Sequence, residues 1–285
     1  MPIPYLVDMI EQGKECEINI LKRSGVGLYL SDESGEEVLL PNKYCTEEMK
    51  PGEKVKVFIY RDSEGRKVAT TLTPKINLHE FALLKVNALT AVGAFLDWGL
   101  EKDLMVPFRE QKQKMEEGRW YIVYLDLDQK TDRLFASNRL ERYLQNDELT
   151  IKEGDEVALV VQQKTDLGYA VIINHRHKGL VFDNEVFTEV HIGDRLKGFV
   201  KKVRDDKKID VSLQALGFRG ANDANSELIL KKLKAYDGFL PITDKSTPEE
   251  ISSQFGISKK AFKKSLGSLY KQRLIEIQPT GIQLL

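Results

Sequence analysis

The chain of 285 residues contains 41% hydrophobic and 31% charged residues and has a formal net charge of −1. This composition is typical of a folded globular protein, and the length suits several small domains better than one. The sequence has no apolar run near 18 residues, and its first residues lack the basic start and apolar stretch of a signal peptide, so we expect a cytoplasmic protein without a membrane span.

Three repeats marked by glycine precede residue 220. The marks Gly27, Pro41 and Gly52 recur 66 residues later and again after a further 75 residues. The second and third sets of marks are Gly93, Pro107 and Gly118, and Gly168, Phe182 and Gly193. Because one offset serves all three marks in each step, the pattern predicts tandem copies of one small domain.

Each copy contains five short runs that are typical of β-strands. The runs of the second copy are FALLKVNALT, GAFLDWG, LMVPF, RWYIVYLDLD and RLFAS. Five strands in such a short segment fit the oligonucleotide-binding (OB) barrel, a five-stranded Greek key. We therefore predict a mainly β chain with OB barrels at 1–73, 74–149 and 150–219.

The sequences of these repeats resemble that of the S1-type RNA-binding domain. GAFLDWG at 93–99 resembles its Gly-Ala-Phe-Val-Asp-hydrophobic-Gly signature, and KGLVF at 178–182 resembles its Gly-Leu-Val-His segment, with Phe182 in place of His. The segment 192–213 resembles the closing part of the domain. The first copy departs most from the pattern and the second has Pro107 at the His position, so we expect RNA contacts mainly from the third copy.

Single-stranded RNA offers flat bases and a charged backbone, so exposed aromatic side chains beside Lys or Arg are the expected contacts. In the second copy these candidates are Phe95, Trp98 and Phe108, with Lys102 and Arg109 close by. In the third copy the candidates are Tyr169, His175, Arg176, His177, Lys178, Phe182, Lys201 and Lys202. Two alternatives remain open: the aromatic residues can belong to the barrel cores, and the loop at 174–179 can be merely solvated.

Beyond residue 220 the pattern becomes helical, and we predict an α+β unit at 222–285. SELILKKLKAY suits an amphipathic helix. Thr247, Pro248 and Glu250 form a capping-box signature for a second helix, which Gly256 ends. A third helix and a β-hairpin follow. This order is that of a winged-helix domain, and EEISSQFGISKKAFKKSLGSLYKQRLIEI resembles the helix-turn-helix of that class.

The third predicted helix begins with four lysines in its first six residues and has no acidic residue between 257 and 275. They are Lys259, Lys260, Lys263 and Lys264. Lysines without an adjacent Asn or Gln favour phosphate contacts over base reading, although a solvated helix face remains the alternative. The four predicted domains carry formal charges of −3, −2, +1 and +3 in chain order, which favours a polyanion partner for the C-terminal half.

Three S1-type barrels followed by a winged helix resemble the bacterial family called conserved virulence factor B. The resemblance implies a cytoplasmic RNA-binding protein that affects the expression of other genes. We therefore expect binding of single-stranded RNA with low sequence specificity, in post-transcriptional regulation. Two alternatives remain: a transcription regulator that binds duplex DNA through the winged helix, and an adaptor that binds proteins through barrels 1 and 2.

The sequence shows no sign of enzyme chemistry. It contains no nucleotide-binding glycine loop, no HExxH, no CxxC and no pairing of nucleophile and base. His175 and His177 are close in sequence but have no Cys or carboxylate set beside them, which is poor evidence for a metal site. We expect no catalytic residues, no cofactor and no bound metal, and we expect Cys16 and Cys45 to be reduced.

Overall fold

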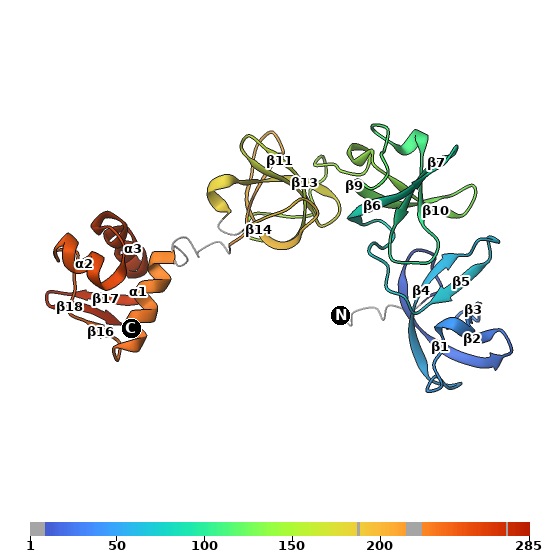
Figure 1. Ribbon diagram of the computed structural model, residues 1–285, viewed down its shortest axis with the longest axis horizontal. Coiled ribbons are helices and arrows are strands. Elements are labelled where there is room, and N and C mark those ends of the chain that lie inside the picture. The colour runs from blue at the N-terminus through green and yellow to red at the C-terminus, as the bar shows by residue number, and fades with distance from the viewer. Residues whose placement is uncertain (1–8, 187–188, 215–223, 272) are drawn as a thin grey trace.

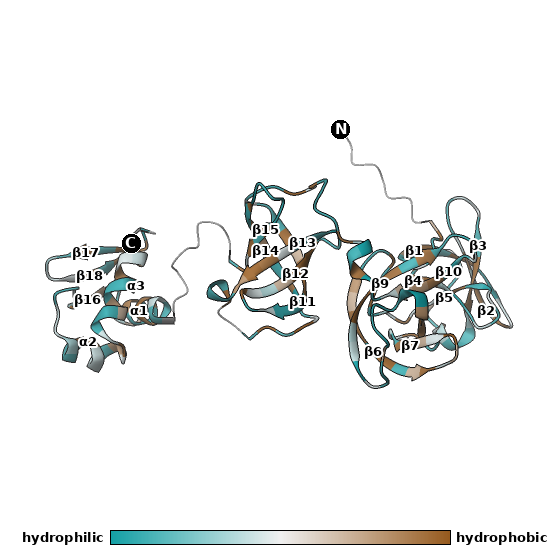
Figure 2. Ribbon diagram, turned by 90° about the horizontal axis from the view of Figure 1, so that it is seen from above, coloured by the Kyte–Doolittle hydropathy of each residue, from teal (hydrophilic) through white to brown (hydrophobic). Residues whose placement is uncertain are grey.

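The computed structural model describes residues 9–186, 189–214, 224–271 and 273–285. Three β units and a C-terminal α+β unit follow one another along the chain (Figure 1). In Figure 2, hydrophobic residues concentrate on the strands of the β units, as expected for side chains that fill barrel interiors. The predicted fold class is confirmed for this order of units, with one difference in the second unit.

Barrel 1 is closed by hydrogen bonds between all neighbouring strands, in the order β1-β2-β3-β5-β4. Its strands are β1 Glu15–Ser24, β2 Gly27–Ser31, β3 Glu37–Pro41, β4 Lys54–Arg61 and β5 Lys67–Thr70. Alternation along β1 places Cys16, Ile18 and Ile20 in the barrel core. Cys16 is buried and Cys45 is half-buried, and no disulfide joins them.

Barrel 3 repeats this closed topology, in the order β11-β12-β13-β15-β14. Its strands are β11 Glu156–Thr165, β12 Gly168–Ile173, β13 His177–Phe182, β14 Arg195–Val203 and β15 Ile209–Ser212. A parallel ladder between β13 and β15 joins Gly179 to Ile209 and Val181 to Val211, which closes the barrel.

The repeated glycines have two structural roles. The first glycine of each copy opens the second strand and lies opposite the last residue of the third, as Gly27 does with Pro41. A Cβ atom on Gly27 would lie 2.1 Å from the carbonyl oxygen of Leu40, so no other residue fits there without a shift of the backbone. The glycine at the third mark has another role: Gly52 has φ of +92° and donates its N–H to the Ile20 carbonyl at the bulge of the first strand. The spacing of the marks therefore reflects one barrel geometry used three times.

Barrel 2 differs from the predicted closed barrel. Its strands are β6 Phe81–Leu89, β7 Gly93–Asp97, β8 Leu104–Pro107, β9 Trp120–Asp128 and β10 Arg133–Ser137. They form a five-stranded sheet in the order β10-β9-β6-β7-β8, in which β8 and β10 are neighbours without a hydrogen-bonded ladder. The sheet is thus rolled into a barrel with one open seam.

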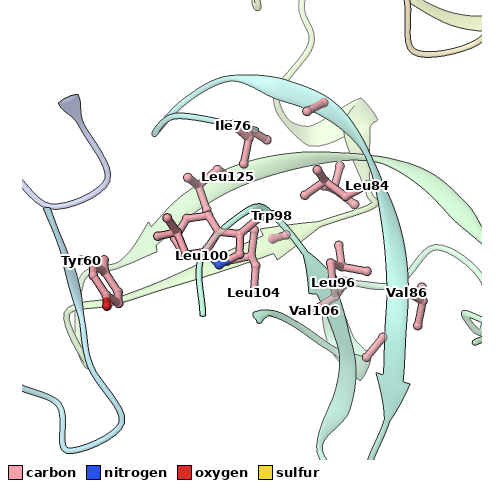
Figure 3. Packing of buried hydrophobic residues seen from close by; sticks show 14 of the residues in the cluster. Tyr60, Ile76, Leu84, Val86, Leu96, Trp98, Leu100, Leu104, Val106 and Leu125 are labelled. Carbon is pink, nitrogen blue, oxygen red and sulfur yellow. The ribbon is translucent and has the colours of Figure 1, made fainter. Parts of the chain in front are cut away.

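Barrel 1 packs directly against the interior of barrel 2. Phe58 and Tyr60 of β4 belong to the same buried cluster as the core of barrel 2, and the ring of Phe58 meets Trp98 edge to face at 5.6 Å. Figure 3 shows Tyr60 on its strand of barrel 1, facing Trp98 and Leu104. Side chains of barrel 1 thus bury part of the apolar interior of barrel 2, next to which the seam is open.

A second apolar cluster joins barrels 2 and 3. It contains Phe81, Ile122, Leu140, Leu144, Val160 and Ile172. Gly193 of barrel 3 lies so close to Leu83 of barrel 2 that a Cβ atom at position 193 would be 2.6 Å from that side chain. The glycine at the third mark of the third copy therefore serves the junction as well as its own barrel.

The C-terminal unit has the winged-helix order that the sequence predicts. Its elements are α1 Ala224–Ala235, β16 Phe239–Leu240, α2 Pro248–Phe255, α3 Lys259–Lys271, β17 Ile275–Gln278 and β18 Gly281–Leu284. The capping box is confirmed, because Thr247 accepts from the Glu250 N–H and the Glu250 carboxylate accepts from the Thr247 N–H. Gly256 ends α2 with φ of 65°. The helices and the hairpin enclose one apolar core around Phe262.

Candidate nucleic-acid interface

An apolar cleft of about 800 Å³ opens on barrel 2 beside the seam between β8 and β10. Its walls come from β7, β8 and β10, from the β6–β7 and β9–β10 loops, and from the end of β4 in barrel 1. The lining residues that concern binding are Tyr60, Arg61, Phe95, Lys102, Phe108, Arg109, Arg133 and Phe135. The second and third strands and these two loops are the parts with which OB barrels bind oligonucleotides. The cleft thus lies where this fold class places its ligands.

Phe95, Phe108 and Arg109, three of the candidates in barrel 2, line this cleft with accessible side chains. Phe108 begins a short 3-10 helix directly after β8 and is 51% exposed, while Phe95 on β7 is half-buried. The guanidinium of Arg109 is exposed and lies 3.2 Å from the Asp128 carboxylate. Two aromatic rings and a cation at one opening match the contacts that a single strand needs.

Trp98 does not fit the role predicted for it. It is only 3% exposed, its ring packs against Phe58, and its indole N–H donates to the carbonyl of Lys102 at 2.6 Å. The core alternative is therefore correct for Trp98. Barrel 1 covers this indole from outside the repeat, which nothing within the GAFLDWG segment could indicate.

Two further cations of barrel 2, Lys102 and Arg133, line the cleft. Lys102 donates to the backbone carbonyl of Asp62, and burial followed by the charge of Arg133 lowers the pKa of its ammonium group. Arg133 and Phe135 stand two residues apart on β10, so alternation places both on the cleft side. The run RLFAS could have indicated this pair. Tyr60 and Arg61 come from another barrel, and no signal in the sequence points to them.

The candidates in barrel 3 are more dispersed. Tyr169 is half-buried against the barrel core, with the Lys164 ammonium 4.1 Å from its ring centroid. Phe182 is half-buried below the guanidinium of Arg204, at 5.7 Å. Lys201 forms an ion pair with Glu185, whereas Lys202 is exposed. These side chains do not line the cleft, which belongs to barrels 1 and 2.

The segment 174–179 separates into histidines held by protein contacts and exposed cations. His177 is 0% exposed and is held by the Gln145 carbonyl and by the Thr150 hydroxyl, so it cannot contact RNA as predicted. His175 is also taken up by protein contacts, because its Nδ1 accepts the Phe81 N–H of barrel 2 at 3.0 Å. Arg176 and Lys178 are exposed. Of the four candidates in this segment, Arg176 and Lys178 are thus available to a ligand, and the two histidines are not.

The His175 contact predicts a pH dependence at the junction of barrels 2 and 3. Burial lowers the pKa of His175, Glu80 partly offsets this, and the charge of Arg195 lowers the pKa further. Because the folded pKa is below the usual value of about 6.5, this contribution to stability is present above pH 6.5 and is lost as the pH falls through the folded pKa. We expect the Phe81 amide to exchange hydrogen faster near pH 5 than near pH 7, after correction for intrinsic rates.

The control for this measurement is His175→Asn. The backbone at position 175 has φ of 53°, which Asn tolerates, and an amide oxygen can accept the Phe81 N–H without titrating. The variant should show little dependence on pH. Equal protection of Phe81 at both pH values in the unmodified protein would contradict the assignment.

The lysines of the winged helix lie on α3 in unequal surroundings. Lys260 and Lys264 are exposed, while the Lys263 ammonium lies 3.8 Å from the Asp244 carboxylate. Lys259 is half-buried, with its ammonium 3.4 Å from the Lys245 carbonyl. Lys260 and Lys264, one helical turn apart, are the pair best placed to reach a phosphate backbone.

Two structural features bear on other classes of function. Within the described ranges, no group of three or more His, Cys, Asp or Glu side chains is placed to hold a metal ion. None of the helices in the part of the chain that the structure describes has the length and apolar character needed to cross a membrane.

Comparison with known proteins agrees with these domain classes. Residues 13–72 match the model of the S1 domain, and residues 227–284 match that of the CvfB-like winged helix domain. OB-fold barrels are a class of domain that binds oligonucleotides. A solved multidomain protein with nucleic acid binding domains from Streptococcus pneumoniae is 23% identical, covers 96% of this chain and 98% of its own, and gives a TM-score of 0.40.

Curated relatives match nearly the whole chain. The uncharacterized protein YitL of Bacillus subtilis is 28% identical over 93% of this chain and 90% of its own. Conserved virulence factor B of Staphylococcus epidermidis and that of Staphylococcus aureus are each 26% identical over 94% of this chain and 92% of their own. The resemblance expected from the sequence is confirmed: the protein combines an S1 domain with a CvfB-like winged helix domain and is similar to conserved virulence factor B along almost its entire length.

Proposed function

We propose that this protein binds single-stranded RNA with low sequence specificity and acts in post-transcriptional regulation of gene expression. The observation that carries the proposal is the cleft of barrel 2, where Phe95 and Phe108 stand among the cations of Arg109 and Arg133. Base stacking on such rings requires unpaired bases, which favours a single strand over a duplex. The similarity to conserved virulence factor B supports a regulatory role.

Low specificity follows from the state of the polar groups in the cleft. The Asp128 carboxylate already accepts from the N–H groups of Lys130 and Thr131 and pairs with Arg109. The Asp103 carboxylate accepts from the Asn87 amide at 3.1 and 3.3 Å. Because both carboxylates already accept from protein donors, base edges would have to compete for them. Stacking and phosphate attraction would then be the main sources of affinity.

A competition experiment tests the proposal. Labelled single-stranded RNA bound to the full chain is challenged with unlabelled single-stranded RNA, single-stranded DNA and duplex DNA of equal length, at one stated salt concentration. Displacement by the single strands at concentrations well below that of the duplex is the expected result. Preferential displacement by duplex DNA would instead favour a transcription regulator, and no binding of any nucleic acid would favour a protein-binding adaptor.

Duplex DNA remains the second candidate ligand because α3 presents a basic surface. We expect Lys260→Ala combined with Lys264→Ala to make the plot of log affinity against log salt concentration shallower. The change should be about 0.7 per lost phosphate contact on a single strand and about 0.9 on a duplex. The slope therefore reports whether α3 touches the backbone of either ligand.

The matched control removes Lys50 and Lys54, which are also exposed but belong to barrel 1. Both double variants lose two positive charges, and neither should change the unfolding temperature much, because exposed lysines contribute little to stability. If the α3 variant and the control keep the same salt slope, α3 is not part of the binding surface.

A further inference from the structure

Barrel 1 contacts the β9–β10 loop of barrel 2, residues 129–132, through hydrogen bonds and an ion pair to Asp132. The carbonyl oxygen of Asp132 accepts from Arg61 Nε at 2.8 Å and from Gln12 Nε2 at 3.2 Å. The carboxylate of Asp132 also pairs with the guanidinium of Arg61. Both donors lie in barrel 1, so Asp132 has its carbonyl acceptor sites and its charge satisfied by the neighbouring domain.

The same arginine borders the cleft. Arg61 and Tyr60 line it from the barrel 1 side, and Thr131 and Arg133, on either side of Asp132, line it from barrel 2. The Arg61 side chain is 26% exposed, and its Nη1 donates to the Gly65 carbonyl at 2.5 Å. With Nε, Nη1 and Nη2 all engaged in protein contacts, Arg61 is better suited to hold the loop than to bind a phosphate.

We propose that barrel 1 belongs to the single-strand site of barrel 2, with Arg61 as the positioning residue that fixes the β9–β10 loop in its binding conformation. This inference rests on the proposed function. It gives barrel 1 a role that its sequence did not suggest: it supplies a wall of the cleft and orders a loop, without offering a binding face of its own.

The loop conformation explains why a clamp matters. Asp132 has φ of 51°, in the left-handed region, and its N–H donates to the Asp128 carbonyl at 2.7 Å. Asp tolerates this backbone region better than most residues but still favours others. Without Arg61 the loop would sample more conformations, and ordering it on binding would oppose affinity.

The test compares Arg61→Gln with Arg66→Gln in the full chain. Arg66 lies in the hairpin next to Arg61, pairs with Asp62 and Glu64 of its own barrel, and does not line the cleft. Each variant removes one positive charge from barrel 1, so general electrostatic effects on RNA binding should match. We expect Arg61→Gln to bind a single-stranded RNA about three- to tenfold more weakly, the scale of ordering one loop segment, and Arg66→Gln to bind as the unmodified protein does.

Two further measurements separate positioning from direct contact. Hydrogen exchange of the free protein should show faster exchange in the β9–β10 loop of Arg61→Gln and no change in Arg66→Gln. Asp132→Asn keeps a residue that tolerates positive φ but removes the ion pair. If Arg61 acts through Asp132, the double variant should bind hardly more weakly than Arg61→Gln alone, whereas additive losses would show direct contact with RNA and overturn the proposal.

The outcomes distinguish this proposal from the function on which it rests. If the unmodified chain binds no single strand, the proposed function itself fails. If the unmodified chain binds RNA and a folded Arg61→Gln variant binds equally well, single-strand binding stands and the role of barrel 1 is refuted.

Discussion

Replacing Phe108 with Ala should weaken the binding of single-stranded RNA by about 1–3 kcal/mol, the scale of one lost base stack. Phe108 is the most exposed aromatic ring of the cleft in barrel 2, so its loss removes a stacking surface while leaving the barrel core intact. The dissociation constant, measured by fluorescence anisotropy at fixed salt, should rise roughly 5- to 150-fold. The unfolding temperature should change little.

The matched control is Trp120→Ala in the same barrel. Trp120 is 55% exposed, comparable to Phe108, but it stands at the start of β9 and does not line the cleft. We expect this variant to keep nearly full affinity. An equal loss of affinity in both variants would move the binding surface away from the cleft, and an unchanged affinity of Phe108→Ala would remove this ring from the site.

Replacing Gly27 with Ala should destabilise barrel 1 by at least about 3 kcal/mol, which combines a backbone clash with strain at positive φ. A Cβ atom at position 27 would lie 2.1 Å from the Leu40 carbonyl oxygen, and φ at this residue is +150°. Since the obstructing atom belongs to the backbone of a paired strand, no side-chain rotation relieves the contact. Hydrogen exchange in β1–β3 should accelerate accordingly.

Gly25→Ala is the control, two residues away in the same hairpin. Nothing lies within 4 Å of a Cβ atom at position 25, and its backbone does not have the positive φ of Gly27. Substitution there should change the exchange rates of β1–β3 little. Similar exchange in both variants would show that the close approach at Gly27 is relieved by a small shift of the strands.

Several features could be predicted because they depend on residues close in sequence. The first glycine of each repeat (Gly27, Gly93 and Gly168) indicates where the second strand of that copy starts, because the hairpin brings this residue against the end of the third strand. The capping box at Thr247 follows from side chains three residues apart. Local backbone geometry and alternation were thus sufficient to predict the barrels and the winged helix.

The candidate site was only partly predictable. Phe95, Phe108 and Arg109 were found from the repeat pattern and do line the cleft. Trp98 and His177 were plausible RNA contacts by residue type, but both are buried. A pattern within one repeat predicts which side chains point out of the barrel interior, but it does not predict which of them another domain covers.

The sequence by itself determined the number of barrels, the start of their second strands and the winged-helix order, because these depend on alternation, turn glycines and helix caps within short segments. Only the tertiary structure decided which side chains line the candidate binding cleft. Arg61 meets Asp132 across 71 positions, and Phe58 covers Trp98 from another barrel. Packing between domains sets which side chains meet solvent, and each domain's own sequence specifies only the surface that it brings to that contact.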